Sequence, residues 1–152
     1  MQPVEIKDIK NDDFEIWLPL WKSYQRFYEV DIPDSVTHKT WIRFLDPLEP
    51  IHAALAMVDG QAVGLVHFIY HRSTWATSDD CYLQDLFVAA DGRGNGVGRA
   101  LIEHVYANAK SRGVSRVYWL THEYNHNARQ LYDRITNRSG VHPLSKTIYL
   151  TR

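Results

Sequence analysis

Four of the eight glycines in this 152-residue sequence alternate within seven residues, at positions 92, 94, 96 and 98. They stand between an apolar run typical of a buried strand and a run with amphipathic helical spacing. In such a strand–loop–helix arrangement, successive backbone N–H groups and the helix N-terminus converge on one point, which favours binding of phosphate. Glycine permits positive φ and close approach of the anion to the backbone. The alternative interpretation is a plain tight turn.

The spacing of these glycines narrows the choice of phosphate ligand. The loop lacks G-x-x-x-x-G-K-[ST], and with it the lysine and hydroxyl that hold a nucleoside triphosphate and its magnesium. It also completes no register of G-x-G-x-x-G, because the last position falls on Val97, Arg99 or Leu101. Both common nucleotide-binding loops are therefore disfavoured.

Two more motifs flank the loop Arg93-Gly94-Asn95-Gly96-Val97-Gly98. Leu83-Gln84-Asp85-Leu86-Phe87-Val88 precedes it, and Asn125-His126-Asn127-Ala128-Arg129-Gln130-Leu131-Tyr132 follows it. Together, R-x-x-G-x-G and N-x-x-A-x-x-L-Y resemble the GNAT superfamily of acetyl-CoA-dependent N-acetyltransferases. The stretches 75–88 and 117–119 are further similar to the branch that contains the yeast histone and polyamine acetyltransferases.

The resemblance implies a fold and a coenzyme site. The fold is a single α/β domain over residues 1–152 (α+β by some schemes), with a mixed, largely antiparallel sheet flanked by helices. Its strands at 82–88 and 114–121 splay apart to receive the pantetheine arm of acetyl-CoA, and no metal is required. The resemblance also implies a homodimer. The residues expected to bind the coenzyme are Leu86, Phe87, Val88, Arg93, Gly94, Asn95, Gly96, Val97, Gly98, Arg99, Asn125 and Arg129.

Acyl transfer to a primary amine requires a neutral nucleophile, an oxyanion donor and a proton for the departing thiolate. Tyr132 resembles the family's general acid, although it could also belong to an apolar helical stripe. The Val88 N–H is the position that the family uses for the oxyanion.

The general base is harder to assign. Many relatives carry a glutamate on the strand before the loop, whereas this chain has Tyr82 and Gln84 on the corresponding face. Asp85 and Glu123 are the candidate bases, and a structural ion pair or helix cap is the alternative for each. The other alternative is that the amine loses its proton through water. In a regular strand Asp85 points to the opposite face.

The substrate is expected to be a polyamine, a lysine side chain or another small cationic amine. Tyr24, Tyr28 and Glu29, near the end of the first helix, are candidate substrate contacts. Residues 1–90 carry a net charge of −7 and residues 91–152 a net charge of +6. This division suits a cationic substrate in the first part and coenzyme phosphates in the second, although ordinary solvated faces would give the same pattern.

Two other classes of protein remain open. His122-Glu123-Tyr124-Asn125-His126 has the form H-E-x-x-H of zinc peptidases. However, it spans the end of a strand and the start of a helix, so its residues do not share one helical face. The other class is a non-catalytic acyl-CoA-binding module.

Positioning these motifs requires ten elements in the order βααβββαβαβ. We expect a strand at 4–9, a helix from 11–13 through Tyr28 interrupted at Pro19, and a second helix capped by Ser35. Strands at 51–58 and 61–70 form a hairpin around Asp59-Gly60. A strand at 81–88, a helix from Val97 closed by Gly113 and a strand at 114–121 follow. A helix at 125–137 and a strand at 147–150 complete the order.

The composition fits a globular enzyme. The hydrophobic fraction is 45% and the net charge is −1, which removes the usual electrostatic reason to bind nucleic acid or a membrane. A single cysteine cannot form an internal disulfide, no apolar run is long enough to span a bilayer, and the first residues lack a secretory signal. We therefore expect a cytoplasmic protein.

Overall fold

The computed structural model describes residues 2–114, 116–122 and 146–150. Six strands of this part form one sheet in the order β1-β2-β3-β4-β5-β6. Neighbours from β1 to β4 pair antiparallel, whereas β4–β5 and β5–β6 pair parallel. The elements are β1 (Glu5–Asp8), η1 (Asn11–Asp13), α1 (Phe14–Phe27), α2 (Asp34–Leu45), β2 (Ile51–Val58), β3 (Gln61–His71), β4 (Asp80–Val88), η2 (Ala90–Gly92), α3 (Val97–Ser111), β5 (Arg116–His122) and β6 (Lys146–Leu150).

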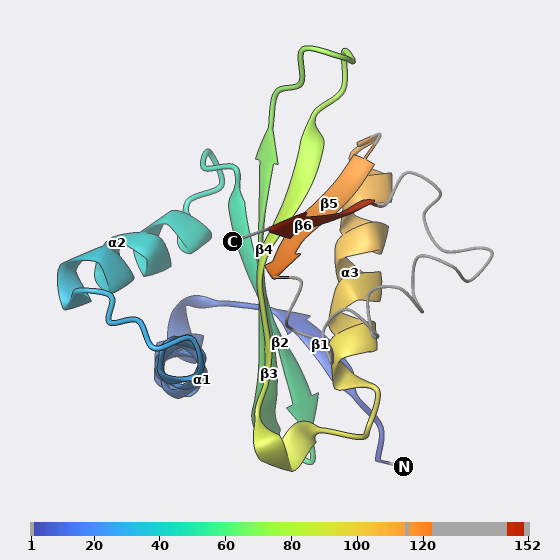
Figure 1. Cartoon of the computed structure of the whole chain (residues 1–152). Helices are drawn as coiled ribbons and strands as arrows, with labels where there is room; N and C mark the ends of the chain where they lie inside the picture. Colours follow the sequence, from blue (N-terminus) through green and yellow to red (C-terminus); the bar gives the residue numbers. More distant parts are fainter. Residues whose placement is uncertain (1, 115, 123–145, 151–152) are drawn as a thin grey trace.

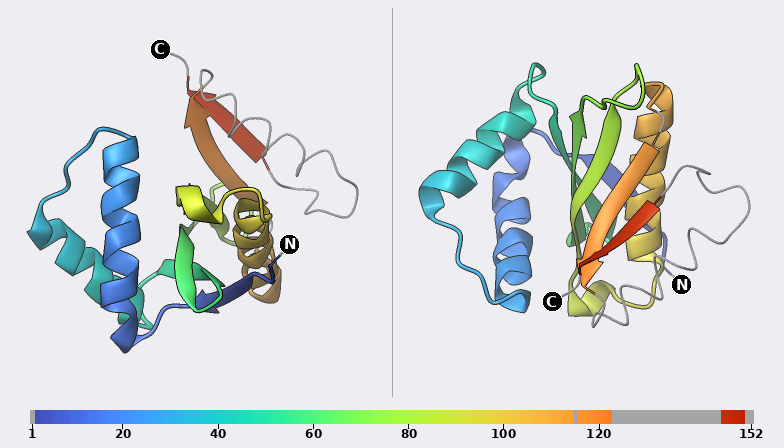
Figure 2. Two further views of the ribbon diagram at one scale, coloured as in Figure 1. Left: turned by 90° about the horizontal axis from the view of Figure 1, so that it is seen from below. Right: turned by 45° about the horizontal axis from the view of Figure 1, so that its top comes forward.

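The helices cover both faces of the sheet. Helices α1 and α2 lie on one face and α3 lies on the other, as Figures 1 and 2 show from three directions. This three-layer arrangement confirms the predicted α/β fold, with a mixed and mainly antiparallel sheet between helices. No helix in the described part of the chain is both long enough and apolar enough to cross a membrane.

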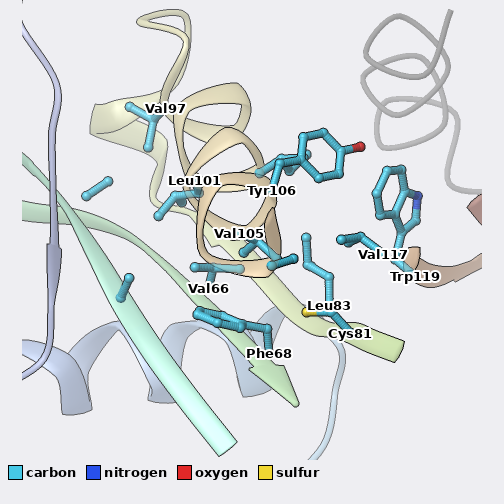
Figure 3. Packing of buried hydrophobic residues seen from close by; sticks show 14 of the residues in the cluster. Val66, Phe68, Cys81, Leu83, Val97, Leu101, Val105, Tyr106, Val117 and Trp119 are labelled. Atoms are coloured by element: carbon cyan, nitrogen blue, oxygen red, sulfur yellow. The ribbon is translucent and has the colours of Figure 1, made fainter. Parts of the chain in front are cut away.

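Each face of the sheet has its own hydrophobic cluster. On the α3 face, Val66, Phe68 and Leu83 of the strands pack against Leu101 and Val105 of the helix (Figure 3). On the α1/α2 face, a second cluster contains three of the five tryptophans, Trp17, Trp21 and Trp41. The sheet is therefore covered on both faces, as the apolar pattern of β4 predicts.

The hairpin of β2 and β3 is confirmed at the predicted turn. Asp59 and Gly60 have φ values of 50° and 76°, so both central residues are left-handed, as a two-residue type I′ turn requires. Gly113 follows α3 with φ of 67° and closes that helix as predicted.

Pro19 does not interrupt α1, which is a correction to the sequence prediction. The helix continues from Phe14 to Phe27 with Pro19 inside it. Proline removes the bond that its N–H would give to the carbonyl of Glu15. Both residues are exposed, so water can satisfy that carbonyl. The cost of the proline is therefore too small to end a helix whose opposite side is buried.

The predicted cap of α2 is also wrong. The N-cap residue is Pro33, whose carbonyl accepts the N–H groups of Val36 and Thr37 at 3.0 and 3.1 Å. Ser35 is already the second helical residue. Asp34 stands in the first turn, where its negative charge complements the helix dipole. The predicted helix at 125–137 lies outside the described residues.

Candidate functional site

The two central parallel strands separate as predicted. Strands β4 and β5 pair only at Asp80–Arg116, Cys81–Val117 and Tyr82–Tyr118. Beyond Tyr82, β4 continues to Val88 in contact with β3, and β5 continues to His122 in contact with β6. The facing edges of the two strands are therefore unpaired with each other at the carboxyl end of β4.

The peptide groups of Leu86 and Val88 face this open edge. Ala89 donates its N–H to Val63 of β3 at 2.8 Å. Because successive peptide groups in a strand alternate in direction, those of Val88 and Leu86 point away from β3. Phe87 differs from its two neighbours: its backbone faces Leu65 of β3. The structure thus offers Leu86 and Val88, but not Phe87, as backbone partners for a ligand between the strands.

The glycine loop has the conformation that the sequence predicts. Gly94 and Gly96 have φ values of 84° and 72°, and a Cβ added to either would meet no atom within 4 Å. The space beside the loop is therefore open, which fits the approach of an anion. Gly92 has another role, because a Cβ there would lie 2.7 Å from Cβ of Val63. It is glycine because the chain packs closely against β3.

Helix α3 begins directly after the loop, with Gly96 as its N-cap. Its first turn contains no acidic side chain, so no carboxylate competes for the N–H groups at the positive end of the helix dipole. Arg93 is exposed, and its Nε donates to the carbonyl oxygen of Val88 at 3.4 Å. Arg99 pairs with Glu103 at 2.9 Å. Of the other predicted loop contacts, Asn95 and Gly98 are half-buried, whereas the Val97 side chain is buried in the α3 cluster.

A bulge in β4 corrects the predicted orientation of Asp85. His67 pairs with Asp85 and Phe68 pairs with Leu83, which leaves Gln84 as an extra, exposed residue. The inserted residue shifts the alternation of side chains, so Asp85 lies on the α1/α2 face together with Tyr82. A regular strand would have placed these two side chains on opposite faces.

Two predicted site residues meet at this bulge. Tyr24 of α1 donates its hydroxyl hydrogen to Oδ1 of Asp85 at 2.8 Å. The Asp85 side chain is only 13% exposed, and its Oδ2 lies 2.9 Å from Nδ1 of His67. A carboxylate at the border of the aromatic cluster thus receives two hydrogen bonds.

Sequence reasoning missed two members of this network, His67 and Trp17. The indole Nε1 of Trp17 donates to Nε2 of His67 at 3.0 Å, and both residues are buried. The only sequence signal is that His67 has the parity of the apolar residue Leu65 on the same strand. Trp17 does lie in the sequence at helical spacing from Trp21, Tyr24 and Tyr28, which together form an aromatic stripe along α1, and it fills the core at one end of that stripe.

Aromatic residues continue from Asp85 in two directions. Along the sheet, Tyr82 stacks on Tyr118 with ring centroids 5.0 Å apart. Burial first, then the negative charge of Asp85, raises the pKa of Tyr82 above its usual value, so its hydroxyl is neutral at neutral pH. Along α1, the rings of Tyr24 and Tyr28 are in contact, with their centroids 4.8 Å apart.

The end of α1 carries the remaining predicted substrate residues. Tyr28 is 40% exposed, and Glu29, which is also exposed, ends the helix in a left-handed conformation with φ of 56°. The aromatic stripe of α1 therefore changes along its length from the buried Trp17 to the accessible Tyr28.

Several predicted residues lie outside the described part of the chain. They are the general acid Tyr132, the alternative base Glu123, the coenzyme residues Asn125 and Arg129, and all of the H-E-x-x-H motif except His122, which ends β5. Within residues 2–114, 116–122 and 146–150, no group of three or more His, Cys, Asp or Glu side chains is arranged to hold a metal ion.

The profile of the Acetyltransferase (GNAT) family matches residues 7–136. The chain therefore belongs to the GNAT family, and it is an N-acetyltransferase. D-amino-acid N-acetyltransferase HPA3 of Saccharomyces cerevisiae is 38% identical to it over 138 residues, which is 90% of this chain and 86% of that protein.

Solved structures share the fold. Ribosomal-protein-alanine N-acetyltransferase from Brucella melitensis biovar Abortus 2308 superposes with a TM-score of 0.70 at 26% identity, covering 91% of this chain and 94% of that one. Aminoglycoside N-acetyltransferase AAC(6')-Iy in complex with CoA gives a TM-score of 0.75 at 20% identity, over 88% of this chain and 87% of that one. The second likeness concerns the fold alone.

Proposed function

We propose that the protein transfers the acetyl group of acetyl-CoA to the primary amine of a small cationic substrate, by direct attack within a ternary complex. The observation that carries this proposal is the contact between Tyr24 and Asp85 beside the open edge of β4. It joins a partly buried carboxylate and a half-buried phenol at the point where the two central strands separate.

The described residues fit acetyl-CoA, which supplies the acetyl group as an activated thioester. The open loop at Gly94 and Gly96 and the N-terminus of α3 would hold its pyrophosphate. The peptide groups of Leu86 and Val88 would bind its pantetheine arm. Arg93, exposed beside the loop, would add positive charge near the phosphates.

Asp85 acts as the general base in this proposal. Its carboxylate accepts a proton from the substrate ammonium, and the resulting neutral amine attacks the acetyl carbon. The new C–N bond forms and the C–S bond breaks. The Val88 N–H stabilises the oxyanion between these events, and Tyr132 donates the proton that the leaving thiolate takes up. The second proton, which the attacking nitrogen loses as the amide forms, returns to Tyr132.

The substrate proposal follows from charge and from the aromatic surface. Tyr24 bonds to Asp85 and packs on Tyr28, and Glu29 follows at the end of the helix. The π faces and negative charges of these residues favour a cation. Polyamines and lysine side chains meet this description. Because HPA3 is named for D-amino acids, these belong in the same panel of test amines.

The test measures thiol release from acetyl-CoA with that panel. Asp85→Asn and Tyr132→Phe should each lower kcat by about 10²-fold or more, the usual contribution of a positioned proton donor or acceptor. Asp46→Asn is the matched control, because the Asp46 carboxylate accepts the N–H of Leu48 in the turn after α2. Full activity of Asp85→Asn would remove the base assignment. Absence of turnover with every amine would favour the acyl-CoA-binding module.

We also propose one acetyltransferase domain over residues 1–152, a homodimer, and a location in the cytosol. Trp75, on the loop between β3 and β4, is 94% exposed and is the contact that we propose for the dimer, because tryptophan is enriched at protein interfaces. Cys81 is a buried free thiol, which suits a reducing compartment. Sedimentation of the wild type and of Trp75→Ser tests the homodimer, and cell fractionation tests the cytosolic location.

A further inference from the structure

A buried histidine lies behind Asp85 without any role in the chemistry proposed above. His67 is 3% exposed and packs between rings of both helices, with Trp21 and Phe44 each 4.8 Å from its centroid. From β2 its register partner is Ala53. Asp85 is the charged group that contacts it among the described residues. Burying a polar ring among aromatic side chains costs free energy unless its nitrogen atoms form hydrogen bonds.

The two hydrogen bonds of His67 define its protonation state. An indole N–H can only donate, so Nε2 of His67, 3.0 Å from Nε1 of Trp17, must accept and carries no hydrogen. A neutral imidazole carries one hydrogen, which is therefore on Nδ1 and is donated to Oδ2 of Asp85 at 2.9 Å. A second proton on Nε2 would point at the indole hydrogen and break the Trp17 contact.

This arrangement has an electrostatic consequence for Asp85. A histidine beside a carboxylate commonly becomes an imidazolium, and the pair is then neutral overall. Here the Trp17 donor occupies the position of the second proton, so the carboxylate keeps its full negative charge. The bond from Nδ1 also holds Oδ2, while Tyr24 holds Oδ1. Trp17 and His67 therefore determine the charge of the carboxylate, and the bonds from His67 and Tyr24 determine its orientation.

We infer that Trp17 and His67 are positioning residues for acetyl transfer: Trp17 keeps His67 neutral, and neutral His67 orients Asp85 as an uncompensated anion toward the substrate amine. This inference rests on the proposed function, because it assigns a purpose to the charge of Asp85. It predicts that His67 affects catalysis only through Asp85.

The first experiment tests the protonation state without any activity. In ¹⁵N-labelled wild-type protein at pH 7, correlations of the ring nitrogens with the ring carbon-bound protons distinguish the two tautomers. The signals of His67 are identified by their loss in His67→Asn. We expect a protonated Nδ1 and a bare Nε2. A hydrogen on Nε2, in either the other tautomer or the imidazolium, would overturn the inference.

The second experiment compares two substitutions at position 67. His67→Asn keeps an N–H donor on the atom bonded to Cγ, where Nδ1 stands, whereas His67→Leu removes the donor. Loss of a hydrogen bond to a charged group predicts a fall in kcat of about 10- to 100-fold for the leucine variant. The asparagine variant should recover most of that loss, and KM for acetyl-CoA should not change in either. Equal kcat values for the two variants would contradict the inference.

A double-mutant cycle separates positioning from general damage. If His67 acts through Asp85, the variant Asp85→Asn/His67→Leu should have the kcat of Asp85→Asn alone, within about twofold. If the losses in kcat of the two single variants multiply in the double variant, His67 has a merely structural role. His52→Leu and His52→Asn are matched controls, because His52 lies on the neighbouring strand and stacks on Phe68 of the α3 cluster. Neither should alter kcat.

Failure of the proposed function gives a different result. If Asp85→Asn alone retains full activity, the base assignment fails whatever the tautomer of His67. If Asp85→Asn is inactive while His67→Leu is fully active, the base assignment stands and the positioning role is wrong.

Discussion

The face of the sheet under α3 and the face under α1 and α2 are filled with different side chains. The α3 cluster consists mainly of aliphatic residues such as Val66, Leu101 and Val105, with no ion pair among its members. The α1/α2 cluster is built around three tryptophans, and one of them, Trp17, begins the hydrogen-bonded chain through His67 to Asp85. Aliphatic packing needs only shape and volume, whereas a buried polar chain must also satisfy every donor and acceptor. If Asp85 is the base, as we propose, stability and catalysis depend on opposite faces of one sheet.

The largest effect is expected in the α3 cluster. Ile102 is 0% exposed, and Ile102→Ala should lower the free energy of unfolding by about 2–5 kcal/mol, the usual cost of such a cavity. Denaturant unfolding measures this loss. At a temperature where the variant is folded, kcat should equal that of the wild type. A large fall in kcat would break the division between the two faces.

Gly64→Ala should disturb the contact of β3 with the start of α3, next to the open end of β4. A Cβ there would lie 3.0 Å from the carbonyl oxygen of Phe87 and from Cγ1 of Val97. Overpacking of this kind costs about 1–3 kcal/mol in unfolding free energy. Because β4 or the start of α3 must move, KM for acetyl-CoA should also rise. Gly60→Ala, in open space with φ of 76°, is the control and should leave KM unchanged.

Trp17→Phe should lower kcat, which Ile102→Ala leaves unchanged, and should lower the free energy of unfolding less than Ile102→Ala does. It removes the donor to His67 and part of a ring, at a cost of about 1–2 kcal/mol in unfolding free energy. The freed Nε2 of His67 can then take a proton, so we expect kcat to fall by about tenfold. Steady-state kinetics and the ¹⁵N spectrum of His67 report the two changes together. If kcat is unchanged although Nε2 is protonated, the charge of His67 does not affect catalysis.

A smaller effect is expected at the start of α1, away from the Asp85 network. Burial opposes ionisation of Asp13, but the bond from Lys7, 2.8 Å away, and the N–H of Lys10 outweigh it and hold the pKa of this carboxyl below its usual value. Asp13 therefore stabilises the fold above about pH 4, and that stability is lost as the pH falls through its lowered pKa.

Asp13→Asn should remove this part of the acid dependence and cost about 1 kcal/mol at neutral pH. Unfolding curves between pH 2 and pH 7 test it. Some acid dependence should remain, because the hydrogen bond from His104 likewise lowers the pKa of Asp8. Identical pH profiles for the variant and the wild type would show that Asp13 contributes nothing.

The smallest effect concerns Cys81, the single cysteine, in the α3 cluster. Burial raises the pKa of its thiol to about 12, so the reactive thiolate is almost absent from the folded protein at pH 8. Iodoacetamide should leave the native enzyme unmodified and fully active, and mass spectrometry measures this. Ile102→Ala should be alkylated faster in proportion to its unfolded fraction. Rapid modification of the wild type would show that the α3 face opens locally.

The sequence predicts best those features that depend on local chemistry. The hairpin at Asp59-Gly60 and the left-handed loop glycines follow from residue types alone, since few residues tolerate positive φ. The bulge at Gln84 depends instead on the pairing of two strands, which no local pattern reports. The orientation of Asp85 was therefore predicted wrongly even though the residue itself was chosen. The contact between Tyr24 and Asp85 joins residues 61 positions apart, so it too required the tertiary structure.

The bulge also determines how this stretch of chain can change in length. Because Gln84 is an extra residue, each side chain after it lies on the face opposite to the one that a regular strand would give it. Deleting Gln84 would make Leu83 and Asp85 consecutive, as their partners Phe68 and His67 already are on β3. The alternation would then be regular, with Leu83 still on the α3 face and Asp85 still on the α1/α2 face. Loss of a residue between Asp85 and Val88 would instead move the rest of the strand to the opposite face. Position 84, which is exposed, is therefore the place where this strand tolerates a change in length.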